Sequence, residues 1–202
     1  MRKILISLLS VFALSMSCAQ DKHIAHSINR ESWEEEISPA VMAEMGMDFP
    51  IFKVYQFEDS KGEGTLVLTE SNESKNAKGE PLNTTVMAFM LRGSDGNFTK
   101  VWENVHDISK DVQNEQSIWY WSKYVECMDM DKDGESETIL VFGTSGQNNF
   151  DDGRVFIEIY YKGNLISIEH QNGVKDLERI TLINPAFYKL PSAIQDKVKY
   201  KM

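Results

Sequence analysis

The chain has 202 residues, of which 42% are hydrophobic and 26% charged, and its formal net charge at pH 7 is −10. This length is sufficient for one domain with its own hydrophobic core. The excess of carboxylates argues against the basic surface that nucleic-acid binding or adsorption to anionic lipid headgroups requires. We therefore expect no nucleic-acid partner.

Residues 1–17 have the pattern of an export signal. Arg2 and Lys3 give a positive start, and the apolar run over 4–16 that follows is too short to span a bilayer. The pattern predicts a protein that leaves the cytoplasm.

Two kinds of export signal fit the end of this run. Residues 14–18, with the sequence LSMSC, resemble a bacterial lipobox, in which Cys18 would carry a lipid and 18–30 would form a tether. By resemblance to bacterial sorting signals, Ala19 after the cysteine favours the outer membrane, with the domain facing the periplasm or the cell surface. The alternative is an ordinary secretory signal cleaved after Ala19, which would release a soluble protein.

Residues 31–202 are expected to form a single β-rich domain. Ser32 is placed to cap a short helix over 33–36, whose acidic residues suit the first turn. From residue 51 onward the chain is rich in β-formers, and Asp95-Gly96 is a strong hairpin signal. The predicted strands cover 51–57, 64–70, 84–92, 98–102, 119–127, 138–142, 154–161 and 165–169.

The last predicted element is a short helix near the C-terminus. Ser192 followed by Gln195 fits a capping box, and Ile194 and Val198 would form the face that packs on the sheet. About eight or nine strands with one or two short helices predict a mainly β (α+β) fold, as an antiparallel sheet that is curled or sandwiched. A complete propeller is excluded because it needs at least four four-stranded blades.

The most informative motif is the acidic loop, residues 129–137, which reads DMDKDGESE. Alternate side chains of such a loop can point inward, and Gly134 allows the backbone to turn around an ion. Hard cations such as Ca²⁺ take several oxygen ligands at about 2.3–2.6 Å. We expect Ca²⁺ to be bound by the side chains of Asp129, Asp131, Asp133 and Glu137 and the main-chain carbonyl of Glu135. The alternative is a solvated acidic turn.

The acidic loop differs from an EF-hand. That motif needs a bidentate Glu at its twelfth position, which is Leu140 here, and helices on both sides, whereas the flanks here are β-like. The pattern between strands resembles the loop of FG-GAP and VCBS repeats. We expect the metal to be structural rather than catalytic.

The order of features over 100–163 resembles a family of small exported Gram-negative lipoproteins labelled as surface polysaccharide biosynthesis proteins. Members typically open the loop with Ile-Thr-Asp-Leu-Asp, where residues 126–131 of this chain read ECMDMD. The segment 143–153 is rich in Gly and Asn and lacks the cysteine that is usual in the family. The resemblance implies a surface or periplasmic role and no established reaction.

Two further segments are candidates for ligand binding. Strand alternation puts Trp119 and Trp121 on one face and Tyr120 and Tyr124 on the other, and their size favours the tryptophans in the core. Tyr120 and Tyr124 are then the candidates for stacking against a glycan. The segment 143–153 is expected near the acidic loop, either as a plain hairpin connection or as a recognition loop with the candidates Asn148, Asn149, Asp151 and Asp152.

No catalytic constellation is visible in the sequence. His106 and His170 stand alone without zinc-site spacing, and Cys127 is interpreted as a small buried hydrophobe. We therefore expect no enzyme, but a membrane-anchored lipoprotein whose calcium-stabilised domain binds a glycan or a protein partner. The alternatives are an accessory factor in surface polysaccharide assembly and an inhibitor or immunity lipoprotein that binds a basic enzyme.

Overall fold

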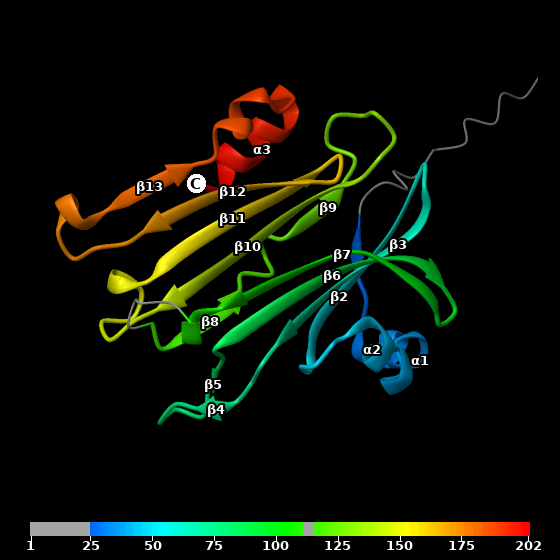
Figure 1. Ribbon diagram of the computed structural model, residues 1–202, viewed down its shortest axis with the longest axis horizontal. Helices are drawn as coiled ribbons and strands as arrows, with labels where there is room; N and C mark the ends of the chain where they lie inside the picture. Colours follow the sequence, from blue (N-terminus) through cyan, green and yellow to red (C-terminus); the bar gives the residue numbers. More distant parts are fainter. Residues whose placement is uncertain (1–24, 111–114) are drawn as a thin grey trace, which may run out of the picture.

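The computed structural model describes residues 25–110 and 115–202, which form two antiparallel sheets packed face to face (Figure 1). The export signal predicted over 1–17, the lipidation site Cys18 and most of the tether predicted over 18–30 lie outside the described residues. The predicted mainly β (α+β) class with a sandwiched antiparallel sheet is confirmed.

The N-terminal sheet has the strand order β1-β2-β3-β6-β7. Its strands are β1 (His26–Ser27), β2 (Ile51–Asp59), β3 (Gly62–Glu70), β6 (Thr85–Ser94) and β7 (Asn97–Asp107). The predicted Asp95-Gly96 hairpin joins β6 to β7. The segment between β3 and β6 contains a two-stranded ribbon of β4 (Ser74–Lys75) and β5 (Pro81–Leu82).

The C-terminal sheet has the order β13-β12-β11-β10-β8, with β9 also paired to β10. Its strands are β8 (Ser117–Tyr120), β9 (Glu126–Met128), β10 (Glu137–Ser145), β11 (Arg154–Tyr161), β12 (Asn164–Gln171) and β13 (Ile180–Ile183). The single strand predicted over 119–127 is wrong, because a turn at 122–124 divides it into β8 and β9. Nine of the described strands have four residues or more, which matches the expected number.

Three α-helices are described: α1 (Arg30–Glu36), α2 (Pro39–Met45) and α3 (Ser192–Lys201). The predicted caps are wrong, since Asn29 caps α1 and α3 begins after Pro191 without a side-chain cap. The buried face of α3, Ile194 and Val198, is as predicted. Short 3₁₀ turns lie at η1 (Ile108–Lys110), η2 (Phe150–Asp152), η3 (Asp176–Glu178) and η4 (Pro185–Lys189).

Helix α2 was not predicted, although the residues at both of its ends are typical helix-capping residues. Ser38 accepts a hydrogen bond from the Val41 amide, Pro39 opens the helix, and Gly46 ends it with φ of 74°. Val41 and Met45 are buried against the N-terminal sheet.

Three apolar clusters give the molecule four layers. One cluster fills the space between the sheets, with Phe142 and Leu66 fully buried in it. The second lies under α3 and η4 on the outer face of the C-terminal sheet, and the third lies under α1 and α2 on the outer face of the N-terminal sheet (Figure 1). In the part of the chain that is described, no helix has both the length and the hydropathy to cross a membrane.

Candidate metal site and ligand pockets

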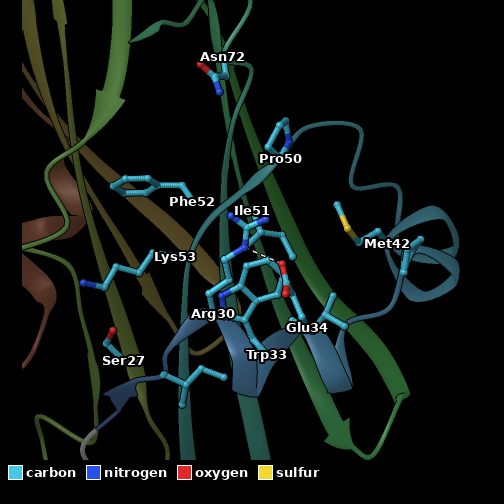
Figure 2. A pocket seen from close by; sticks show the side chains of 13 residues that line it. Ser27, Arg30, Trp33, Glu34, Met42, Pro50, Ile51, Phe52, Lys53 and Asn72 are labelled. Atoms are coloured by element: carbon cyan, nitrogen blue, oxygen red, sulfur yellow. Dashed lines mark hydrogen bonds and ion pairs between the residues drawn. The ribbon is translucent and has the colours of Figure 1, made fainter. Parts of the chain in front are cut away.

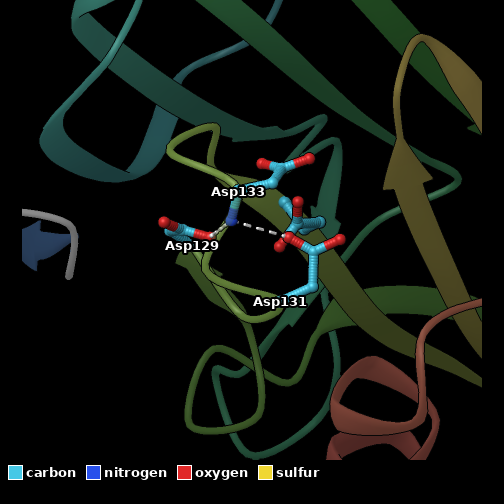
Figure 3. A group of neighbouring side chains, drawn as sticks. Asp129, Asp131 and Asp133 are labelled. Atoms are coloured by element: carbon cyan, nitrogen blue, oxygen red, sulfur yellow. Dashed lines mark hydrogen bonds between the residues drawn. The ribbon is translucent and has the colours of Figure 1, made fainter.

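The acidic loop connects β9 to β10 and brings four carboxylates together. Each of Asp129, Asp131, Asp133 and Glu137 offers an oxygen, and these oxygens lie within 4.8 Å of one another. Figure 3 shows the three aspartates around the inside of the turn. Such a cluster can hold a metal ion.

Backbone amides orient these carboxylates. The Asp133 amide donates to Asp129 Oδ1 at 3.1 Å and to Asp131 Oδ1 at 3.2 Å, and the Gly134 amide donates to Asp129 Oδ2 at 3.0 Å. Gly134 has φ of 94°, in the region that favours glycine, as expected from the sequence. The Tyr161 hydroxyl on β11 donates to Asp131 Oδ2 at 3.2 Å. These hydrogen bonds hold the carboxylates in one cluster, in which Asp129 and Asp131 are half-buried and Asp133 is exposed.

Glu137 is the buried member of the cluster, with 2% of its surface exposed. Its Oε2 accepts a hydrogen bond from the Met130 amide at 2.8 Å. Burial, together with the nearby aspartates, raises the pKa of Glu137 to about 7. A cation in the loop would relieve this repulsion and favour the ionised form.

Two lysines from neighbouring hairpins already contact the loop. Lys162 Nζ, in the turn between β11 and β12, lies 2.7 Å from Asp133 Oδ2. Lys61 Nζ, in the turn between β2 and β3, lies 2.6 Å from Glu135 Oε2. The Glu135 carboxylate is therefore engaged outside the cluster, which leaves its main-chain carbonyl as the group predicted to face an ion.

Asp59 ties the acidic loop to the other sheet. Its side chain is fully buried and forms a two-point ion pair with Arg92, with Oδ1 to Nη1 at 2.8 Å and Oδ2 to Nη2 at 2.7 Å. Asp59 Oδ2 also accepts from the Ser136 amide at 2.9 Å, while the Ser60 amide donates to the Gly134 carbonyl at 2.8 Å. Burial opposes ionisation of Asp59, but these donors outweigh it and hold the carboxyl pKa below its usual value. The acidic loop is thus a joint between the two sheets.

The predicted surface role of Tyr120 is wrong. Tyr120 is 3% exposed and belongs to the cluster between the sheets, whereas Trp119 and Trp121 are partly exposed. The two faces of the strand are therefore the reverse of those expected, because Tyr120 faces the N-terminal sheet. Tyr124 is 39% exposed, in the turn after β8, with its ring centroid 6.3 Å from that of Trp121.

The segment 143–153 lies far from the acidic loop, contrary to expectation. Strand β10 starts at Glu137 beside the loop and ends at Ser145, and eight steps of about 3.4 Å separate these residues by roughly 27 Å. The side chains at 146–153 therefore cannot reach an ion in the loop. This group includes the four candidates named above, Asn148, Asn149, Asp151 and Asp152.

We call the end of the sandwich where β10 finishes the open end, and a pocket of about 480 Å³ lies there. Phe52 of β2 and Glu70 of β3 line it from the N-terminal sheet, and Trp119 and Phe150 line it from the other side. The β4–β5 ribbon forms a further wall. Two of the predicted ligand-binding candidates, Tyr120 and Asn149, line this pocket, but the sequence did not reveal the pocket itself, because its residues come from five separate segments.

A second groove, the helix groove, lies between α1 and the start of β2 and has a volume of about 880 Å³. Trp33, Met42 and the Arg30–Glu34 ion pair line it (Figure 2). Phe52 lines both the helix groove and the open-end pocket, so the two cavities are neighbours.

No family model, curated protein or solved structure matches this chain.

Proposed function

We propose that this chain is an exported, membrane-anchored binding module whose two-sheet domain is stabilised by Ca²⁺ in the acidic loop. The observation that carries the proposal is the set of four carboxylates at the joint between the sheets. Binding here, rather than catalysis, is the role that this arrangement supports best.

The donor set favours a hard cation. All four side-chain donors are carboxylate oxygens, and the described neighbours of the cluster supply no thiolate or imidazole of the kind that zinc prefers. Four carboxylates and a main-chain carbonyl, completed by water, fit the six to eight oxygen ligands of Ca²⁺. Mg²⁺ requires a stricter octahedral shell and keeps more of its water, so it suits this loop less well.

The position of the loop indicates what the ion would do. A cation that fixes the acidic loop also fixes Ser136 and Gly134, whose backbone groups bond to the hairpin of the N-terminal sheet. Binding to the folded state alone stabilises it by about 2.7 kcal/mol when free Ca²⁺ is a hundredfold above its dissociation constant. The ion would therefore stabilise the contact between the two sheets.

The membrane anchor rests on the sequence. The lipobox-like run before Cys18 supports lipidation, and the resemblance of 100–163 to exported lipoproteins supports the same location. Metabolic labelling with an alkyne fatty acid tests it: label in the wild-type protein that disappears in Cys18→Ser supports the anchor, and unlabelled wild-type protein contradicts it.

Thermal unfolding tests the calcium part of the proposal. The melting temperature of purified protein is measured in EDTA and in millimolar Ca²⁺, with Mg²⁺ at equal concentration as the ionic control. A rise in Ca²⁺ that Mg²⁺ does not reproduce, and that Asp131→Asn abolishes, supports the site. An unchanged melting temperature in Ca²⁺ contradicts it.

A further inference from the structure

The open-end pocket gathers aromatic side chains that the folded core leaves partly exposed. Phe52 is 44% exposed and Phe150 is 50% exposed, and Trp119 beside them is partly exposed. The Trp119 and Phe150 ring centroids are 5.3 Å apart in an edge-to-face arrangement. Three aromatic rings on one concave surface indicate a site that binds a partner with apolar faces.

Phe52 reaches the pocket because of an irregularity in β2. The register between β2 and β3 shifts between Ile51 and Lys53, so Phe52 is the extra residue of a β-bulge. Figure 2 shows Phe52 and Lys53 on the same side of β2, away from Trp33. Without the bulge, strand alternation would turn the two side chains to opposite faces.

Apart from Pro81, Leu82 and Tyr120, the remaining lining is polar, and it carries no positive charge. Glu70 and Asn83 form the floor, where Glu70 accepts from the Tyr120 amide at 3.0 Å and from Asn83 Nδ2 at 3.2 Å. The walls add Ser145, Asn149 and the Asn76–Glu80 pair, in which Asn76 Nδ2 donates to Glu80 Oε2 at 2.6 Å. None of the described residues that line this pocket is Lys, Arg or His. An anionic ligand would therefore face two carboxylates without a counter-charge.

We propose that the open-end pocket binds a neutral oligosaccharide. Sugar rings have an apolar C–H face that packs against aromatic rings, and their hydroxyl groups can donate to carboxylate and amide oxygens. The volume of about 480 Å³ lies within the range of ligand pockets.

This inference names a ligand for the binding role proposed above, and in that sense rests on it, but it uses no residue of the acidic loop. The two sites lie at opposite ends of β10. A calcium titration therefore reports on one end and a sugar titration on the other, and each proposal can fail while the other stands.

The test is titration of purified protein with maltohexaose, cellohexaose, mannohexaose and chitohexaose, followed by calorimetry and by tryptophan fluorescence. The variants are Trp119→Ala and Phe150→Ala, and the matched control is Tyr200→Ala, which removes an aromatic ring that is 90% exposed on α3. We expect at least one sugar to bind, with a loss of affinity of about tenfold or more in both pocket variants and no change in the control.

Phe150 is half exposed, so its removal is expected to leave the core packed, and the thermal melt of each variant verifies this. Absence of binding to all four sugars overturns the proposal, as does binding that both pocket variants retain. Spermidine is titrated in parallel, because the two carboxylates could also hold an amine. Binding of spermidine without binding of any sugar identifies a cation site and overturns the proposal as well.

Discussion

Replacement of Asp59 by Ala is expected to loosen the joint between the two sheets. The substitution leaves the Arg92 guanidinium without its carboxylate, and breaking a buried ion pair from one side costs about 3–5 kcal/mol. The Arg92 side chain is 23% exposed and also donates to the Gly62 carbonyl, which places the loss near the lower end of that range. The Ser136 amide loses its acceptor too, at about 1 kcal/mol. The expected total is about 4 kcal/mol, a large share of the stability of a typical domain.

The assay is urea denaturation at pH 7 in EDTA, followed by tryptophan fluorescence, so that no bound metal contributes. Glu63→Ala is the matched control, because this carboxylate lies in the same hairpin and is exposed. We expect the control to change the free energy of unfolding by less than about 0.5 kcal/mol. A loss of unfolding free energy below about 1 kcal/mol in the Asp59 variant, or one equal to that of the control, would refute the role of Asp59 in holding the acidic loop to the N-terminal sheet.

Three further predictions concern side chains inside or beside the sandwich. Burial raises the pKa of Glu158 to about 7 in the folded protein. The stability that Glu158 contributes in the absence of metal is therefore greatest below its pKa in the unfolded chain, and it is lost as the pH rises through about 7. Glu158→Gln should flatten the pH dependence of urea unfolding between pH 4.5 and 7.5, and an unchanged slope would contradict this. Lys162 competes with a cation for Asp133, so Lys162→Met should tighten Ca²⁺ binding severalfold in calorimetry, whereas weaker binding would show that the lysine assists the site. Cys127 is buried, and burial raises the pKa of its thiol to about 12. In a Cys18→Ser variant, we therefore expect the native protein to react with a thiol reagent only after denaturation. Rapid reaction of the native protein would contradict the burial of Cys127.

The fold class could be predicted because the local signals agree with the final structure. The Asp95-Gly96 and Lys162-Gly163 turns occur where positive φ is needed, and hairpins form at both. The buried face of α3 followed from the spacing of Ile194 and Val198. The acidic loop was visible in the sequence for a similar reason, since its candidate ligands are contiguous.

The errors arose where a side chain's environment is decided by distant segments. Tyr120 and Trp119 alternate as expected, but the face that becomes buried depends on where the N-terminal sheet packs, and side-chain size gave the wrong choice. The role of Asp59 could not be predicted from the sequence, because its partner Arg92 is 33 residues away. The open-end pocket depends on a bulge at Phe52, which single-sequence alternation does not reveal.

Calorimetric titration of Ca²⁺ into the purified protein, beside Asp131→Ala, tests the central claim most directly. We predict saturable binding with a dissociation constant in the micromolar to millimolar range, abolished in the variant, because Asp131 is one of the four clustered carboxylates. Absence of binding heat in the wild type, combined with an unchanged melting temperature, would contradict the claim and identify the acidic loop as a solvated turn.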